Sequence, residues 1–437
     1  MQVNSSHESH TPRIKVVFVA AHDSVGGAAR AAYRVFDAIR THCADEIDIT
    51  FRVVHKTRDD DQIVGGKPIR SRLEYARYFL RTRFRKYFPR KPFVSNNTLL
   101  HSQARYPSGL GREINAMTPD VVMLGWLGNA TLSIEEIGAL QAPIVWRLSD
   151  MWMFSGAEHY TDTGRYQEGY SRRSRPDTES GPDIDRETFR RKKRHWKRPS
   201  HVVALTTWLE KEARSSVLTQ HWPSHVIPVP IDTDFWSPQP KTLAREELGI
   251  PLEDTVIVFG AGGGTAHRHK GADLLFDTLA DLQGHRDNTA ASPSIRVVVF
   301  GESREEENRD GIPVQYVGRL NDAQLRSAYC AADVFVAPSR LEAFGQVAAE
   351  AQSCGTPVVA FDNSGLSDVV HDRVTGRLAS AFDTQSLAEA IRWVVSNPKR
   401  QATLGEAARQ RAIELWSPRV VAEAYVSVLK RAASKPA

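Results

Sequence analysis

The sequence predicts an α/β protein made of two doubly wound domains that face a central cleft. Short apolar, valine-rich segments alternate with helical patterns along the chain, which is typical of parallel sheets covered by helices on both faces. The length of 437 residues suits two or three domains. A proline-spaced stretch at residues 226–238 separates two sets of predicted strands. These three observations lead to the same architecture.

The first domain is expected at residues 13–228. It opens with a buried strand at residues 14–21, because this segment is short, apolar and rich in valine. A turn with two glycines leads into an alanine-rich helix at residues 28–41. Its further strands are expected at 49–55, 121–124, 144–148 and 202–205.

The second domain is expected at residues 229–417. Its predicted strands are residues 256–259, 295–300, 315–317, 334–337 and 357–361, with helices between them. A last helix at residues 418–435 starts with Pro418 and should pack back on the first domain. Because such sheets bind ligands outside the carboxyl ends of their strands, both domains should face the cleft.

The composition excludes several classes of protein. Lys and Arg number 57 against 52 Asp and Glu, and 41% of the residues are hydrophobic, so the chain is not largely disordered. No apolar run approaches the roughly 20 residues of a membrane span, and the polar N-terminus lacks a signal-peptide core. Three cysteines far apart in sequence argue against a disulfide scaffold and a cysteine zinc site. We therefore expect a cytoplasmic protein with no metal and no cofactor.

The most informative stretch is residues 338–357, where a strand should end just before a helix. Glu342 lies at the mouth of the strand, and the first turn of the helix lies near Gly345 to Val347. The free amides and positive end of that helix can hold a diphosphate, and Gly345 would let the backbone approach it closely. Glu350 follows one to two turns into the helix, so both carboxylates can face one ligand, such as the vicinal hydroxyls of a ribose or hexose. The alternative is a buried turn with two solvated glutamates.

This stretch resembles the donor-binding motif of the retaining glycosyltransferases of family 4 (Glycosyl transferases group 1). The resemblance covers residues 14–429 and implies the GT-B fold, with two Rossmann-like domains. It implies that Glu342 contacts the donor sugar, that Glu350 holds the ribose, and that the backbone of Phe344, Gly345, Gln346 and Val347 binds the sugar hydroxyls and the diphosphate.

Other donor contacts follow from the same resemblance. Lys270-Gly271, after the glycine-rich residues 260–264, resembles the family's Lys-Gly pair, and Arg268 joins it as a second cation for the leaving diphosphate. Arg319 and Leu320 resemble the position that frames the nucleobase. In the first domain, Gly26 and Gly27 resemble the glycine turn that faces the donor phosphates and the acceptor, although tight strand-to-helix packing would also explain them.

Residues 147–160 resemble one branch of the family that usually reads His-Asp-x-Trp followed by Gly-x-Cys-His-Tyr. Asp150 and His159 match this pattern and are candidates for the acceptor side. Ser149 replaces the branch's first histidine and Glu158 its cysteine, which argues against a metal or disulfide here. His159 either substitutes for the missing histidine or is structural.

Basic residues concentrate in two stretches, which suggests an anionic partner. Residues 77–91 hold seven basic and no acidic residues, and apolar residues recur at helical spacing over residues 72–88. This helix either lies on an anionic membrane or turns its apolar stripe to the core. Residues 171–198 hold eleven basic residues against five acidic ones and either grip a phosphorylated or lipid-linked acceptor or form a solvated loop.

The resemblance implies a retaining, metal-independent glycosyltransferase, with a UDP- or GDP-linked sugar as donor and a glycan or lipid-linked acceptor. Surface polysaccharide or glycolipid biosynthesis is the expected setting, at the inner face of the membrane. One alternative is a sugar-nucleotide epimerase on the same fold. Another is a non-catalytic basic protein that binds membrane or nucleic acid. No nucleic-acid module with stacking aromatics is recognisable, so we expect no nucleic-acid partner.

Overall fold

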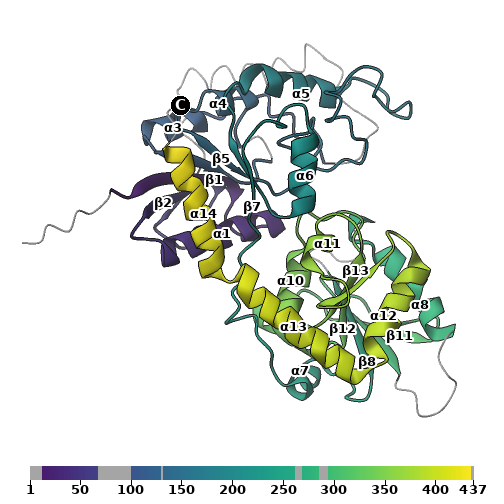
Figure 1. The fold of residues 1–437 in the computed structure, drawn as a ribbon. Helices are drawn as coiled ribbons and strands as arrows, with labels where there is room; N and C mark the ends of the chain where they lie inside the picture. Colours follow the sequence, from purple (N-terminus) through teal and green to yellow (C-terminus); the bar gives the residue numbers. More distant parts are fainter. Residues whose placement is uncertain (1–11, 67–99, 129–130, 261–267, 285–293, 435–437) are drawn as a thin grey trace, which may run out of the picture.

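The computed structural model describes residues 12–66, 100–128, 131–260, 268–284 and 294–434. The chain forms two α/β domains, each built around a seven-stranded sheet (Figure 1). The predicted fold class is confirmed. The basic helix expected within residues 72–88 lies outside the described residues. Among those that are described, no helix is both long and apolar enough to cross a membrane.

The first sheet has the strand order β3-β2-β1-β4-β5-β6-β7, and its neighbouring strands run parallel. Residues 16–20 of the central strand β1 are fully buried, as its run of valines predicts. The strands are β1 (Ile14–His22), β2 (Ile47–His55), β3 (Ile63–Val64), β4 (Val121–Leu124), β5 (Ile144–Arg147), β6 (His201–Ala204) and β7 (Ser224–Val226). The helices are α1 (Gly27–His42), α3 (Leu110–Ala116), α4 (Ile134–Gly138), α5 (Ile184–His195) and α6 (Thr207–Ser215).

The second sheet has the order β10-β11-β9-β8-β12-β13-β14 and is parallel except for the edge strand β10. The strands are β8 (Thr255–Gly260), β9 (Ile295–Phe300), β10 (Glu307–Arg309), β11 (Ile312–Tyr316), β12 (Val334–Ala337), β13 (Val358–Phe361) and β14 (Gly376–Ala379). The helices are α7 (Lys241–Leu248), α8 (Ala272–Gly284), α9 (Asp322–Ala331), α10 (Gln346–Ser353), α11 (Leu366–Val369), α12 (Thr384–Val395) and α13 (Pro398–Trp416), with a 3-10 turn η2 (Arg268–Lys270).

The last helix, α14 (Pro418–Ala433), packs on the first sheet although it follows the second domain in sequence. Its buried side chains Val421, Tyr425 and Leu429 share one apolar cluster with Phe18 of β1. Figure 1 shows α14 alongside α1, on the same side of that sheet. The core of the first domain therefore contains residues from both ends of the described chain.

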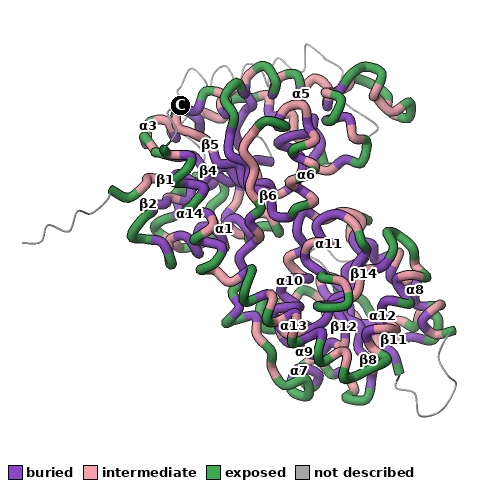
Figure 2. The backbone as a smooth tube through the Cα atoms, viewed as in Figure 1, coloured by how far each residue is buried: buried purple, intermediate pink, exposed green. Residues whose placement is uncertain are grey.

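The chain passes between the domains twice, and the two crossings lie side by side. The first follows β7, and the second joins α13 to α14 at Ser417. The Ile231 amide donates a hydrogen bond to the Trp416 carbonyl at 2.7 Å, and both side chains are buried. Figure 2 shows the buried strands at the centre of each domain and exposed residues around them. One apolar cluster continues across this boundary, because it contains Val19 of the first sheet and Val258 of the second.

Candidate active site

Two oppositely charged side chains meet at the carboxyl end of the second sheet. Lys270 ends the turn after β8, and Glu342 lies in the loop between β12 and α10. The Lys270 ammonium forms an ion pair with Glu342 Oε1, and Ser339 Oγ donates to the same oxygen at 3.2 Å. The side chains of Lys270 and Glu342 are 22% and 13% exposed, so both remain accessible to a ligand. The structure thus brings together the two residues that the sequence places at the reaction centre.

Two glycines hold these loops in place. Gly271 has a φ of 72°, and a Cβ there would lie 1.8 Å from the Pro338 carbonyl oxygen, so the turn that carries Lys270 packs directly on the loop after β12. Gly345 has a φ of 96°, and a Cβ there would lie 2.7 Å from Leu366 Cδ2. Backbone conformation and packing thus require glycine at Gly345, in addition to the close phosphate approach expected from the sequence.

The first turn of α10 borders the same pocket as the ion pair. Lys270, Glu342, Gly345 and Val347 line this pocket together. Gly345 is the N-cap of α10 and has no side chain that could accept a hydrogen bond from the helix amides. The first turn of α10, residues 346–349, contains no acidic residue. The positive end of α10 is therefore open to an anion. The Phe344 ring is buried edge-on against Trp416 at 5.9 Å, so only its backbone can serve a ligand.

Glu350 is buried one turn further along α10, and both of its oxygens have partners. Arg34 of α1, in the first domain, donates from Nη2 to Glu350 Oε1 at 2.6 Å. The Tyr329 hydroxyl, at the end of α9, donates to Glu350 Oε2 at 3.1 Å. Burial, and then the charge of Glu350, raises the pKa of the Tyr329 phenol well above its usual value, so Tyr329 stays a donor. The carboxylate expected at the ribose is therefore bound by both domains.

The remaining residues that are predicted to contact the donor lie at the rim of the second sheet. Arg268 opens the same turn as Lys270, and its side chain is exposed while its carbonyl accepts from Arg340 Nη1 at 2.7 Å. Arg319 is exposed and Leu320 half-buried after β11, next to Gly318, whose φ is 73°. Two strands, β9 and β8, separate β11 from β12, so this loop lies to one side of the Lys270–Glu342 pair.

The N-termini of α1 and α10 meet across the domain interface. Gly26 is the N-cap of α1 with a φ of 86°, and Gly27 is its first residue. The Gln346 side-chain amide donates to the Gly27 carbonyl at 2.9 Å. The glycine turn of the first domain thus lies next to the helix end that borders the Lys270–Glu342 pocket.

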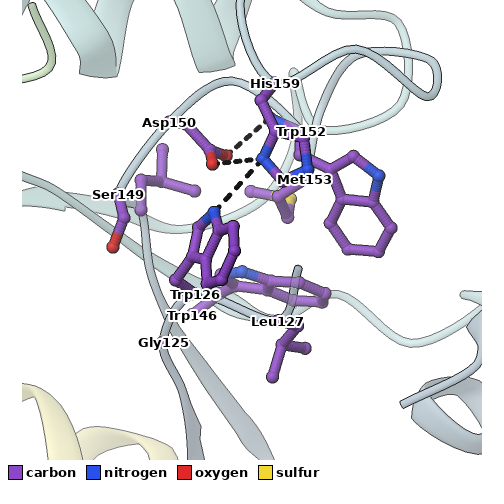
Figure 3. A pocket seen from close by; sticks show the side chains of 10 residues that line it. Gly125, Trp126, Leu127, Trp146, Ser149, Asp150, Trp152, Met153 and His159 are labelled. Atoms are coloured by element: carbon purple, nitrogen blue, oxygen red, sulfur yellow. Dashed lines mark hydrogen bonds and ion pairs between the residues drawn. The ribbon is translucent and has the colours of Figure 1, made fainter. Parts of the chain in front are cut away.

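Asp150 and His159 form a pair in a small pocket at the carboxyl ends of β4 and β5 (Figure 3). Asp150 Oδ2 lies 2.5 Å from His159 Nδ1, which Trp126 Nε1 also approaches at 3.2 Å. On the other side of the ring, His159 Nε2 lies 2.7 Å from Ser102 Oγ. This pocket and the Lys270–Glu342 pocket each have a volume of about 10 Å³, so a ligand larger than a water molecule would have to bind at the mouth of either pocket.

Tyr160, the residue after His159, has a phenol whose pKa responds to charges from both domains. Burial, and then the charges of Asp150 and Glu342, raises the pKa of its phenol well above the usual value. Its hydroxyl also lies 3.5 Å from the Ser149 carbonyl oxygen, where the resemblance leads one to expect a histidine. The charges of Asp150, in the first domain, and Glu342, in the second, therefore both act on the Tyr160 phenol and keep it protonated.

The loop that carries these residues is held from behind by a buried lysine. Lys192 of α5 is fully buried, and its ammonium donates to the carbonyls of Trp152, Ser155 and Gly156. The Trp152 ring lies 4.0 Å from the ammonium, a cation–π contact. Burial lowers the pKa of Lys192 to about 7. This residue of the basic stretch 171–198 thus has a structural role, whereas exposed members of α5 such as Arg190 and Arg194 face solvent.

A second buried group next to Lys192 is Glu158, which stands where the branch pattern has a cysteine. The Tyr170 hydroxyl donates to Glu158 Oε1, and Asp185 of α5 shares a hydrogen bond with the carboxyl group. Burial, and then the hydrogen bond and charge of Asp185, raises the pKa of Glu158 to about 8. The two carboxyl groups therefore share one proton at neutral pH. Among the described residues, no group of three or more potential metal ligands occurs.

Reasoning from the sequence missed the roles of Arg34, Tyr329, Tyr160 and Lys192. A signal existed for Lys192, which follows Phe189 by three residues and precedes Trp196 by four, so all three share one face of the helix. Arg34 and Tyr329 carried no comparable signal, because their shared partner Glu350 is distant in sequence from Arg34 and lies on another helix than Tyr329.

Known proteins share both the fold and the second domain. A glycosyltransferase from Rickettsia africae covers 98% of this chain with a TM-score of 0.64 and 14% identity, over 100% of its own length. Anabaena Alr3699/HepE, solved with UDP and glucose, covers 96% with a TM-score of 0.63 and 16% identity, again over 100% of its own length. At these identities the likeness concerns the fold, which is that of the GT-B glycosyltransferases.

The likeness in sequence lies in the second domain. Residues 240–411 match the model of the family Glycosyl transferases group 1. A D-inositol 3-phosphate glycosyltransferase 1 from Catenulispora acidiphila is 34% identical over 209 residues, which are 45% of this chain and 49% of the relative. A D-inositol 3-phosphate glycosyltransferase from Mycobacterium bovis is 31% identical over 192 residues, 43% of this chain and 39% of the relative. The chain thus spans half or less of the length of these curated relatives.

Proposed function

We propose that the protein is a retaining glycosyltransferase that moves a sugar from a nucleotide-sugar donor to a hydroxyl group of an acceptor. The observation that carries this proposal is the Lys270–Glu342 pair, which shares one pocket with the open first turn of α10. A nucleotide sugar presents an anionic diphosphate beside a ring of hydroxyls. The pocket offers a cation and helix amides for the diphosphate and a carboxylate for the hydroxyls.

Donor binding would exchange the partners of this ion pair. Without donor, Lys270 and Glu342 neutralise each other, and each holds the other in place. A diphosphate competes for the ammonium, and Glu342 then becomes free to accept hydrogen bonds from the sugar. Because both side chains are ordered before the donor arrives, little conformational entropy is lost on binding.

In the proposed reaction, the bond between the sugar carbon and the diphosphate oxygen breaks. The acceptor oxygen bonds to the same carbon on the same face of the ring, and its proton passes to the departing phosphate. Lys270, Arg268 and the amides of residues 344–347 would stabilise the charge that grows on the diphosphate. One such preorganised donor is typically worth about 10²–10³ in rate. This scheme requires neither a protein nucleophile nor a resident metal ion.

The remaining assignments concern the ligands. We assign the ribose to Glu350, the nucleobase to the loop with Arg319 and Leu320, and the acceptor side to Gly26, Asp150 and His159. UDP or GDP is the proposed nucleotide, and the structural relatives include complexes with UDP and UDP-glucose. The proposed acceptor is a glycan or a lipid-linked sugar of a surface polysaccharide or glycolipid, used at the cytoplasmic face of the membrane. The names of the curated relatives add inositol phosphates as candidates.

The test starts with thermal-shift measurements in which UDP, GDP and their common sugars are added, since a ligand of the folded state raises Tm. The best donor is then incubated with and without candidate acceptors, and NMR of the product gives the anomeric configuration. EDTA should leave turnover unchanged. Lys430→Ala, which removes an exposed ion pair with Glu46, is a control of matched chemistry and should behave like the wild type.

Three outcomes would contradict parts of the proposal. If none of these nucleotides raises Tm, the donor site is wrong. If an epimer of the donor sugar forms without acceptor, the protein is an epimerase. If the product has the opposite anomeric configuration, the retaining mechanism is wrong.

A further inference from the structure

The side chain of Arg34 reaches from the first domain into the site assigned to the donor. It projects from α1, and its guanidinium lies against α10. Nη2 donates to Glu350 Oε1 at 2.6 Å, and Nη1 lies 3.4 Å from Gln346 Oε1. The Arg34 side chain is 19% exposed and that of Glu350 6%, so a ligand can reach the guanidinium more easily than the carboxylate.

The contacts with Gln346 and Glu350 place the Arg34 guanidinium beside the first turn of α10. Gln346 is the first residue of α10, directly after Gly345, and Glu350 follows one turn later. The guanidinium therefore spans the distance between the open helix end and the buried carboxylate. The proposed function, on which this inference rests, places the diphosphate at the former and the ribose at the latter. The bond between ribose and phosphate would then pass beside Arg34.

A ligand can form hydrogen bonds with Arg34 and Glu350 without breaking the ion pair between them. A guanidinium has more N–H donors than these two contacts use, and its planar fork suits phosphate oxygens. Each oxygen of Glu350 has one partner, Arg34 or Tyr329, and can accept a further hydrogen bond from a ribose hydroxyl. A cation between the carboxylate and a phosphate also offsets the repulsion between these two anions.

We propose that Arg34 binds the phosphate next to the ribose of a nucleoside diphosphate, so that the first domain supplies a cation to the donor site. The phosphate-binding set then includes Lys270 from the second domain and Arg34 from the first. Nucleotide affinity depends on both domains for this reason. The alternative is that Arg34 only orients Glu350, which would make it a positioning residue for the ribose.

The experiment separates the two roles by comparing a nucleoside with its diphosphate. Full-length protein is titrated with uridine and UDP, or with guanosine and GDP if the thermal-shift measurements favour guanine. Calorimetry measures the diphosphates and ligand-detected NMR the weaker nucleosides. The variants are Arg34→Gln, which keeps a polar side chain without charge, Arg34→Lys, which keeps the charge without the fork, and Glu350→Gln.

For Arg34→Gln, we expect the Kd of the diphosphate to rise roughly 10- to 100-fold, the value of a charged hydrogen bond. The Kd of the nucleoside should change less than about threefold. Arg34→Lys should fall between Arg34→Gln and the wild type, because it keeps the charge but not the fork. Glu350→Gln should weaken nucleoside and diphosphate alike.

The matched control is Arg30→Ala, one turn earlier on α1. Arg30 also faces the second domain, 3.5 Å from Asp322, but both side chains are more than half exposed. An exposed pair of this kind contributes little, so its nucleotide affinities should match the wild type.

Each remaining outcome has a definite meaning. If Arg34→Gln weakens nucleoside and diphosphate equally, Arg34 is a positioning residue and the inference is wrong. If it weakens neither while the wild type binds both, Arg34 has no part in the site. A wild-type protein that binds neither UDP nor GDP overturns the proposed function, and this inference with it. Tm values of all variants show whether the fold is kept, and Arg34→Lys provides the comparison if Arg34→Gln unfolds.

Discussion

The buried carboxyl group of Glu158 should make the first domain less stable as pH rises towards neutral. Its pKa is raised from 4.5 to about 8 by burial and by Asp185, so between these values the folded protein binds one proton more than the unfolded chain. A group with a raised pKa gives stability at low pH and loses it as pH rises through the folded value. Glu158→Gln makes the neutral state permanent, since an amide can still accept from Tyr170 and donate to Asp185.

The magnitude follows from the pH and the unfolded value. pH 7 lies 2.5 units above the ordinary Glu pKa of 4.5, so folding must protonate a carboxylate that is ionised in the unfolded chain. This protonation costs about 1.4 kcal/mol per pH unit. The cost is about 3 kcal/mol, which the glutamine variant avoids. Lys192, with a pKa lowered to about 7, is charged in both states well below that pH, so it adds to the slope only near pH 7.

The assay is urea unfolding at several pH values from 5 to 7, followed by the fluorescence of the tryptophans that surround the loop. The free energy of unfolding of the wild type should fall relative to the variant by about 1.4 kcal/mol per pH unit. His101, beside Asp185, is the same in both proteins, so the difference between them isolates Glu158. Glu168→Gln, an exposed glutamate of the same region, is the control. Parallel pH curves for wild type and Glu158→Gln would refute the shared proton.

Four further predictions concern the site and its support. Glu342→Gln and Lys270→Ala should each lower turnover at least about 10²-fold at nearly unchanged Tm, measured as product formed at saturating donor; near wild-type rates would remove the pair from the reaction centre. Glu350→Ala should raise the donor KM with little change in kcat, because a ribose contact is similar in ground and transition states; an unchanged KM contradicts the assignment. Lys192→Met should lower the free energy of unfolding in urea by about 3–5 kcal/mol, since three buried carbonyls lose their donor. An unchanged urea midpoint would show that Lys192 does not stabilise the loop. Neutralising three basic residues of 77–91, a stretch outside the described residues, should weaken binding to anionic vesicles by roughly 1 kcal/mol per charge; co-sedimentation unchanged by the variant would place that stretch in the core.

Much of the fold was predictable because buried parallel strands are short valine-rich runs. Strands β1 and β12 match their predicted ranges to within one residue. The edge strands were harder: β14 reads Gly-Arg-Leu-Ala and has no β-branched residue, so its sequence does not suggest a strand. Strand β11 begins at Ile312 rather than Gln315, because Pro313 can pair with the edge strand β10 before the pairing with β9 starts at Val314.

The candidate site was predictable where its residues share one loop and not where it joins distant parts of the chain. Glu342, Gly345 and Glu350 lie within nine residues, and their spacing relates them to one helix end. Arg34 and Glu350 are 316 residues apart, and their contact depends on how the two domains meet. Pattern reasoning also assigns lysines to the surface, whereas Lys192 is stabilised inside by carbonyls that only the folded loop brings together.

The return of α14 to the first sheet has a consequence for the order of events during synthesis. Phe18 and its neighbours on β1 are made first, but Tyr425 and Leu429, which cover them, are made only after the entire second domain. While the ribosome is still adding those residues, the nascent first domain exposes an apolar face, and the second domain has all of its strands. The second domain can therefore finish folding before the first. A chain that stalls before residue 418 would present this face to chaperones and proteases.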